Sequence, residues 1–246
     1  MNNYLEINNP DASVGVCCSH KVVTVGFNTL CYDAERRGIK PSVRIKKDSP
    51  IIIDTCIFMV GFDKRQTNQE YSLENMRKNW MDDVLSYFEK ILIHEVVYQE
   101  LDSETRKFID GYIGKNITIV SDKDLFDSDP EFMRIFKEIH DHPLMYAPFN
   151  KNKNQGEVHS LAYACYYNIL FFSSKDTDAC DICNEIEDLH DITIVGFETL
   201  LGIAYQSNPD KDKKKALKAL YKEYCSPRIR QKAIPKTLSE FMREYK

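Results

Sequence analysis

The chain has 246 residues, of which 43% are hydrophobic and 29% charged, and its formal net charge at pH 7 is −5. This length allows one large domain or two small ones, each with a complete apolar core. No uninterrupted apolar run is long enough to span a bilayer, and the first residues lack the basic and apolar regions of a secretory signal. We therefore expect a cytoplasmic protein with no membrane partner.

Residues 1–49 are expected to form an extension ahead of the main domain. Within it, the β-branched stretch 14–27 predicts one or two short strands, and 28–37 predicts a helix that stops at Gly38. A basic linker marked by proline, 40–50, then leads into the main domain.

Short apolar strands alternate with helices through residues 50–206, which we predict to be the main domain. The predicted strands are 51–54, 91–93, 117–120, 169–173 and 192–195. The predicted helices are 70–90, 95–101, 130–140, 157–168, 178–189 and 197–206. This alternation is typical of an α/β fold and predicts a three-layer α/β/α sandwich with a central, mostly parallel sheet.

Residues 207–246 are predicted to form a basic, mostly helical C-terminal tail. Residues 211–246 contain 12 Lys or Arg and 4 Asp or Glu, a balance of +8, whereas residues 1–210 have a balance of −13. An acidic body joined to a basic tail is typical of polyanion binding. A solvated helix face would give the same pattern, and the sequence leaves both interpretations open.

The eight cysteines are scattered rather than spaced as a disulfide framework. We expect most of them to be free thiols that act as small hydrophobic residues in a reducing compartment. Cys180 and Cys183 form a CxxC motif, but no second CxxC and no histidine pair at finger spacing accompanies it. A structural role is therefore expected for this motif.

Five acidic residues lie near the carboxyl ends of predicted strands, where open α/β sheets bind ligands. Asp54 ends the first strand, Glu100 lies in the helix after the second, and Glu157 opens the helix before the fourth. Asp176 and Asp178 follow that fourth strand. Carboxylates that converge repel one another unless a cation neutralises them. We therefore expect a Mg²⁺ or Mn²⁺ site, and with it phosphate chemistry.

Each of these acids also has a simpler explanation. Glu157 in a first helical turn would stabilise the positive end of the helix dipole, and Asp176 or Asp178 would serve as an N-cap. Glu95 lies about 140° from Glu100 around their shared helix, so the two side chains cannot face one site. Glu95 is assigned to the helix dipole, and Glu100 to the site.

Two histidines near these acids are not assigned to the site. His94 lies at a strand-to-helix junction, where a lone histidine is more often a helix cap or a packed side chain than a base. His159 comes two residues after Glu157 and therefore points to a different face of the helix.

The order and spacing of the acidic motifs resemble those of the PIN-domain nucleases over residues 50–206. The motifs are Ile51-Ile52-Ile53-Asp54-Thr55, Glu100-Leu101, Gly156-Glu157 before an alanine-containing helix, and Ser174-Lys175-Asp176-Thr177-Asp178-Ala179 after an apolar strand. The closing strand and helix, 192–206, also fit the family. The chain departs from the family where Cys56 replaces the common Asn, in the long span from Asp54 to Glu100, and in the two terminal regions.

The resemblance implies a metal-dependent endonuclease, most often one that acts on RNA. Asp54, Glu100, Glu157 and Asp176 would ligate Mg²⁺ or Mn²⁺, and Asp178 would act as an outer ligand or orient a water. The basic tail would hold the backbone of single-stranded or structured RNA. A toxin-type or defence enzyme implies an inhibitory protein partner, and the long insert suggests a cap or the arm of a homodimer.

Two other functions stay open on the sequence. The Cys56 departure and the long insert are consistent with a catalytically inactive PIN-fold scaffold that binds RNA or protein. A phosphatase with Asp54 as its covalent nucleophile is disfavoured, because residue 56 is Cys where Asp-x-Asp-x-Thr enzymes have Asp.

Overall fold

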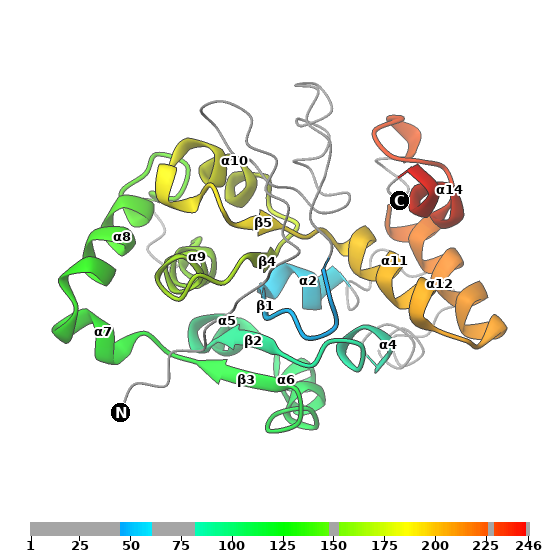
Figure 1. Cartoon of the computed structure of the whole chain (residues 1–246), viewed down its shortest axis with the longest axis horizontal. Helices are drawn as coiled ribbons and strands as arrows, with labels where there is room; N and C mark the ends of the chain where they lie inside the picture. Colours follow the sequence, from blue (N-terminus) through cyan, green and yellow to red (C-terminus); the bar gives the residue numbers. More distant parts are fainter. Residues whose placement is uncertain (1–44, 61–81, 148–152, 226–228, 245–246) are drawn as a thin grey trace.

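The computed structural model describes residues 45–60, 82–147, 153–225 and 229–244 (Figure 1). The strands and the helix predicted within 14–37 lie outside these ranges. Of the predicted helix 70–90, only α4 (Asp82–Leu85) is described as helical. In the described ranges, no helix is both long enough and apolar enough to cross a membrane.

A five-stranded parallel sheet forms the centre of the protein, with strand order β3-β2-β1-β4-β5. The strands are β1 (Ile51–Ile53), β2 (Ile91–His94), β3 (Ile117–Val120), β4 (Phe171–Ser173) and β5 (Thr193–Ile194). Most of their residues are β-branched or aromatic, which suits a pleated sheet that is covered on both faces. The predicted α/β fold with a parallel central sheet is confirmed.

Helices connect the strands and cover both faces of the sheet (Figure 1). In chain order the further helices are α2 (Thr55–Val60), α5 (Glu95–Glu100), α6 (Ser103–Asp110), α7 (Lys123–Ser128), α8 (Pro130–His140), α9 (Gln155–Tyr166), α10 (Thr177–Glu185), the 3₁₀ helix η2 (Glu187–Leu189), α11 (Phe197–Ser207), α12 (Lys211–Tyr224) and α14 (Leu238–Glu244). The sequence pattern did not predict α2, α6 and α7, because each has eight residues or fewer, which is too short for helical periodicity to be recognised in the sequence.

Side chains of each strand alternate between the two faces of the sheet and so build two apolar cores. Ile51 and Ile53 belong to one core, whereas Ile52 and Phe172 belong to the other. Residues of α4, α11, α12 and α14 line the first core, and residues of α8, α9 and α10 line the second (Figure 1). The sheet and these two helical layers make the three-layer sandwich.

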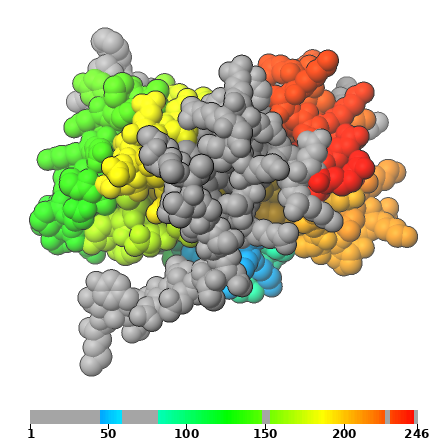
Figure 2. Space-filling model, turned by 45° about the horizontal axis from the view of Figure 1, so that its top comes forward, coloured from blue at the N-terminus to red at the C-terminus, as the bar shows by residue number. Residues whose placement is uncertain are grey.

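The C-terminal helices contribute to the first core. Leu217 and Tyr221 of α12 and Leu238 and Phe241 of α14 are buried in the same cluster as Ile51. Figure 2 shows α12 and α14, in orange and red, at one end of the molecule and α7 and α8, in green, at the other. The basic region predicted at the C-terminus therefore contains the helices α12 and α14, and both pack against the rest of the chain.

The pairing of the strands brings several chain segments to one edge of the sheet. Ile53 pairs with Ser173, and His94 pairs with Val120, so the residues that follow these strands meet at their carboxyl ends. Asp54 is held there by its backbone N–H, which donates to the carbonyl of Ser173 at 2.9 Å. This edge carries the groups described next.

Candidate metal centre

Asp54 lies between β1 and α2 and is almost completely buried, with 1% of its surface exposed. Its Oδ2 accepts hydrogen bonds from the backbone N–H of Cys56 at 3.2 Å and from the hydroxyl of Ser174 at 3.4 Å. Its Oδ1 is buried and has no hydrogen-bond partner in the part of the chain that the structure describes. Burial therefore raises the pKa of Asp54, and the charge of Glu100 adds to the effect.

Glu100 reaches the same place from the last residue of α5. The hydroxyl of Thr55 donates to Glu100 Oε2 at 2.6 Å, so the residue after Asp54 fixes the direction of this exposed carboxylate. Gly156 lies against it, because a Cβ at that position would stand 3.1 Å from both Glu100 Oε2 and Val97 Cγ2. The glycine before Glu157 thus gives α9 room to approach α5.

Glu157 lies in the first turn of α9 and is partly buried. Burial and the neighbouring charges of Asp54, Asp176 and Glu100 raise the pKa of Glu157 to about 8. A carboxyl that only complemented the helix dipole would have an ordinary or lowered pKa. Four of the predicted site residues therefore lie close enough to interact electrostatically: Glu157 with Asp54, Asp176 and Glu100.

Asp176 and Asp178 have different roles. Asp176 is the N-cap of α10: its Oδ1 accepts the backbone N–H of Asp178 at 2.8 Å, and its own N–H donates to Ser174 Oγ at 3.1 Å. In the described residues, no hydrogen bond or ion pair joins the side chain of Asp178 to the other four acids. The simpler N-cap explanation thus applies to Asp176, whose second carboxylate oxygen is left for the site, and the role given to Asp178 stays a prediction.

Cys56, which departs from the family pattern, has a defined place in this structure. Its Sγ accepts the backbone N–H of Lys175 at 3.0 Å and lies 3.4 Å from Ser174 Oγ. Burial and the adjacent Asp54 raise the pKa of the Cys56 thiol well above its usual range, so the thiol keeps its proton. Cys56 therefore ties the segment after β1 to the segment after β4.

This donor set fits a hard divalent cation. All four carboxylates offer oxygen, the preferred ligand of Mg²⁺ and Mn²⁺. Burial first, and the neighbouring carboxylates second, raise the pKa values of Asp54 and Glu157, and Asp54 Oδ1 has no hydrogen-bond partner among the described residues. In the described residues these oxygens do not form a group within 4.8 Å of one another. An ion bound by these acids would therefore have to keep several of its waters, as Mg²⁺ does.

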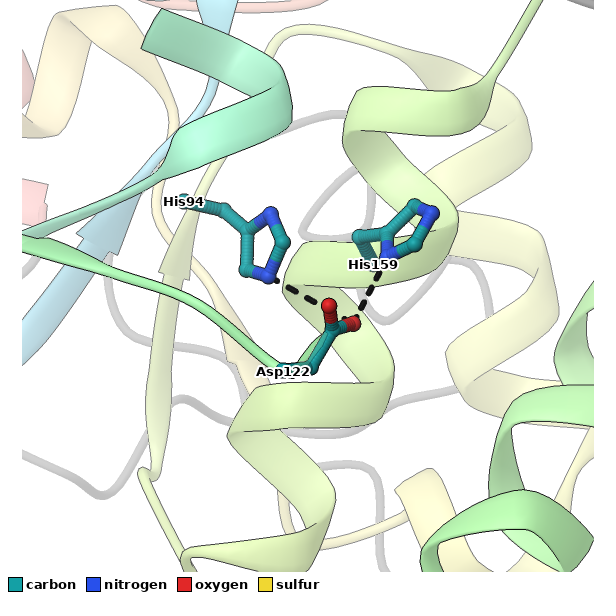
Figure 3. A group of neighbouring side chains, drawn as sticks. All are labelled: His94, Asp122 and His159. Carbon is teal, nitrogen blue, oxygen red and sulfur yellow. Dashed lines mark hydrogen bonds and ion pairs between the residues drawn. The ribbon is translucent and has the colours of Figure 1, made fainter. Parts of the chain in front are cut away.

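A tighter cluster lies further along the same edge and consists of His94, Asp122 and His159 (Figure 3). His159 Nδ1 is 2.6 Å and His94 Nε2 is 3.4 Å from Asp122 Oδ2, and all three ligand-type atoms lie within 4.8 Å of one another. His94 also caps α5, because its Nδ1 accepts the backbone N–H of Val96 at 3.3 Å. Sequence reasoning predicted this capping role but missed Asp122, which follows β3 much as Asp54 follows β1.

A scan against protein-family models found no match, and searches of curated proteins and of solved structures found none either. The similarity to PIN-domain nucleases therefore depends on the motifs of the sequence and on the arrangement of the acids. We carry it forward as a proposal.

Proposed function

We propose that the protein is a Mg²⁺- or Mn²⁺-dependent endonuclease that hydrolyses phosphodiester bonds of RNA. The observation that carries the proposal is Asp54 Oδ1, a buried oxygen without a hydrogen-bond partner among the described residues. The Asp54 carboxylate interacts electrostatically with Glu100 and Glu157, and Glu157 interacts in turn with Asp176. Burying such oxygens without a partner destabilises the folded protein. A bound divalent cation would offset that destabilisation at Asp54.

The side chains at the acidic site, defined as Asp54, Glu100, Glu157 and Asp176, have separable roles in this proposal. A bound divalent ion would supply a water of lowered pKa and neutralise charge on the scissile phosphate. Asp54 is the fixed ligand, since Cys56 and Ser174 hold its other oxygen in place. The hydroxyl of Thr55 fixes the orientation of the Glu100 carboxylate. Glu157 has a pKa of about 8 and is therefore protonated at neutral pH in the absence of an ion, so it would lose its proton when an ion binds.

Helix α12 supports the choice of a polyanionic substrate. Lys211, Lys215, Lys218 and Lys222 are exposed and recur every three or four residues, so they share one face of the helix. The opposite face of α12 is buried in the core. A row of lysines anchored in this way would contact successive phosphates, with binding that weakens as salt rises.

The test is cleavage of a defined single-stranded RNA by the full chain in Mn²⁺, with and without EDTA, followed by mapping of the cut ends. We expect Asp54→Asn and Glu157→Gln each to lower the rate by about 100-fold or more, since loss of a metal ligand exceeds the loss seen for an outer-shell group. Asp191→Asn is the matched control, because Asp191 is an exposed acid that precedes β5 at the opposite edge of the sheet. Full metal-dependent activity in Asp54→Asn refutes the proposal.

The second candidate, an inactive scaffold with the same fold, has a distinct outcome in this experiment. Cys56 favours it, because a thiol stands where the resembled family commonly has an amide. Wild-type protein that binds the RNA, never cuts it and shows no Mn²⁺ affinity by calorimetry would identify the scaffold.

A further inference from the structure

The cluster of His94, Asp122 and His159 joins three elements that are distant in the sequence. His94 ends β2, Asp122 follows β3, and His159 lies on α9 (Figure 3). All three are at least mostly buried: His94 is 0%, Asp122 2% and His159 15% exposed at the side chain. Two imidazoles and a carboxylate thus face one another in the interior, where ionisable groups are rare unless they are paired or bind a metal.

The distances from Asp122 Oδ2 to the two imidazole nitrogens would have to change little for these three atoms to bind a small ion. Four ligands at about 2.1 Å from a tetrahedral ion are about 3.4 Å apart. His94 Nε2 already stands 3.4 Å from Asp122 Oδ2. His159 Nδ1 is closer, at 2.6 Å, which is a short hydrogen-bond distance. A proton therefore holds this pair together in the absence of an ion, and an ion that takes its place would push the two atoms apart by less than 1 Å.

His94 supplies the second, independent observation. Its Nε2 is buried and lies 3.4 Å from Asp122 Oδ2, at ion-pair distance, and within the described ranges of the chain it makes no hydrogen bond of good geometry. The cap on Val96 leaves the proton of a neutral His94 on Nε2, so metal binding there would shift this proton and weaken the cap. The cap is a single hydrogen bond, which a coordinate bond from Nε2 to an ion would outweigh.

We propose that His94, Asp122 and His159 bind one transition-metal ion of the Zn²⁺ class, at a site separate from the acidic site around Asp54. Imidazole nitrogen suits Zn²⁺, Co²⁺ and Ni²⁺ and is a poor ligand for Mg²⁺, so the two sites differ in the metal they select. Three protein ligands leave a fourth position for water, which has access beside His159, the most exposed of the three.

The surroundings of the cluster support this assignment. The rings of Phe126 and Phe136 lie 5.8 and 4.9 Å from that of His159, and Tyr163 stands edge-on to His94 at 6.0 Å. An apolar shell of this kind limits water and orients metal-bound imidazoles. A bound ion would fasten β2, β3 and α9 to one another, and α9 also carries Glu157.

The decisive experiment uses the full chain with Asp54→Asn, which removes a proposed metal ligand from the acidic site. The result is then independent of the proposed nuclease function. Co²⁺ is titrated and followed by visible absorption, and Zn²⁺ is then added in competition. We expect one equivalent of Co²⁺ to give the visible bands of a four-coordinate ion, and Zn²⁺ to displace it. Intense near-ultraviolet absorption from thiolate would instead assign the ion to cysteine and overturn the proposal, as would the absence of bands.

Two further variants locate the ion. Adding His159→Gln or Asp122→Asn to that protein is expected to weaken Zn²⁺ binding by at least about 100-fold, whereas His142→Gln, at a histidine of similar exposure paired with Glu185, is expected to leave it unchanged. Unchanged affinity in both cluster variants refutes the site. If neither variant folds, the proposal is decided by the Co²⁺ spectrum and by whether Zn²⁺ raises the melting temperature of the parent protein.

Discussion

Replacement of Asp54 by asparagine should make the metal-free protein more stable while it removes activity. The aspartate is 1% exposed, and its Oδ1 has no hydrogen-bond partner among the residues described. An unsatisfied buried polar group costs about 1–3 kcal/mol. The amide of Asp54→Asn is neutral, so its burial costs less than that of a carboxylate, and it keeps an oxygen for the N–H of Cys56.

We expect the free energy of unfolding to rise by about 2 kcal/mol at pH 7, or about 4–8 °C in melting temperature for a chain of this size. The sign follows from the raised pKa of Asp54. An acid whose pKa is raised in the folded state stabilises it fully only at low pH, and this contribution is lost as the pH rises through the folded pKa. The advantage of Asp54→Asn over the wild type should therefore grow as the pH rises from acid to neutral.

Thermal melts in EDTA and in Mn²⁺ test this reasoning together. Ligand at 100 times its dissociation constant stabilises a protein by about 2.7 kcal/mol, so saturating Mn²⁺ should make the wild type at least as stable as Asp54→Asn. Asp191→Asn, the exposed control, should melt with the wild type under both conditions. A less stable Asp54→Asn in EDTA, or an equal response of both proteins to Mn²⁺, would refute the idea that Asp54 is retained for a cation.

Three more predictions concern the acidic site. Mn²⁺ binding should release protons near pH 7 and tighten as the pH rises toward about 8, because Glu157, whose pKa is raised to about 8, must lose its proton. Calorimetry in buffers of different ionisation enthalpy measures the number of protons released. A pH-independent affinity would contradict this prediction. Thr55→Val should weaken Mn²⁺ binding by about 10–100-fold with little change in melting temperature, because it frees Glu100; Thr55→Ser, which keeps the hydroxyl, should restore binding. Gly156→Ala should lower the cleavage rate, since its Cβ would meet Glu100 and Val97 at 3.1 Å; wild-type rates would show that the neighbours yield.

The fold could be predicted from the sequence because its signals are local. Apolar runs such as Ile51–Ile53 lie between turn signals, and a parallel sheet follows from their alternation with helices. Asp54 was found by the same logic, since the carboxyl end of a parallel strand is where ligands bind. For His94 the sequence predicted either a helix cap or a packed side chain, and the structure shows the cap, which provides an acceptor for a free N–H at the start of α5.

Contacts between distant segments could not be predicted in this way. The bond from Thr55 to Glu100 spans 45 positions, and the pair of Asp122 with His159 spans 37. Each depends on how closely one helix crosses a strand end, which the apolar pattern does not encode. The bond from Lys175 to Cys56 is of the same kind, and it explains how a thiol serves at a position where the family commonly has an amide.

The burial of the C-terminal helices determines how the lysines of α12 can be studied. Leu217, Tyr221, Leu238 and Phe241 are each at most 2% exposed and lie against the β1 face of the sheet. Each large apolar side chain contributes about 1.5–3 kcal/mol, so truncation before α12 would remove on the order of 10 kcal/mol, comparable to the whole stability of a typical domain. A shortened chain would unfold whether or not α12 binds nucleic acid. Only charge-altering substitutions on the outer face of α12 can therefore separate its role in the core from its proposed role in binding.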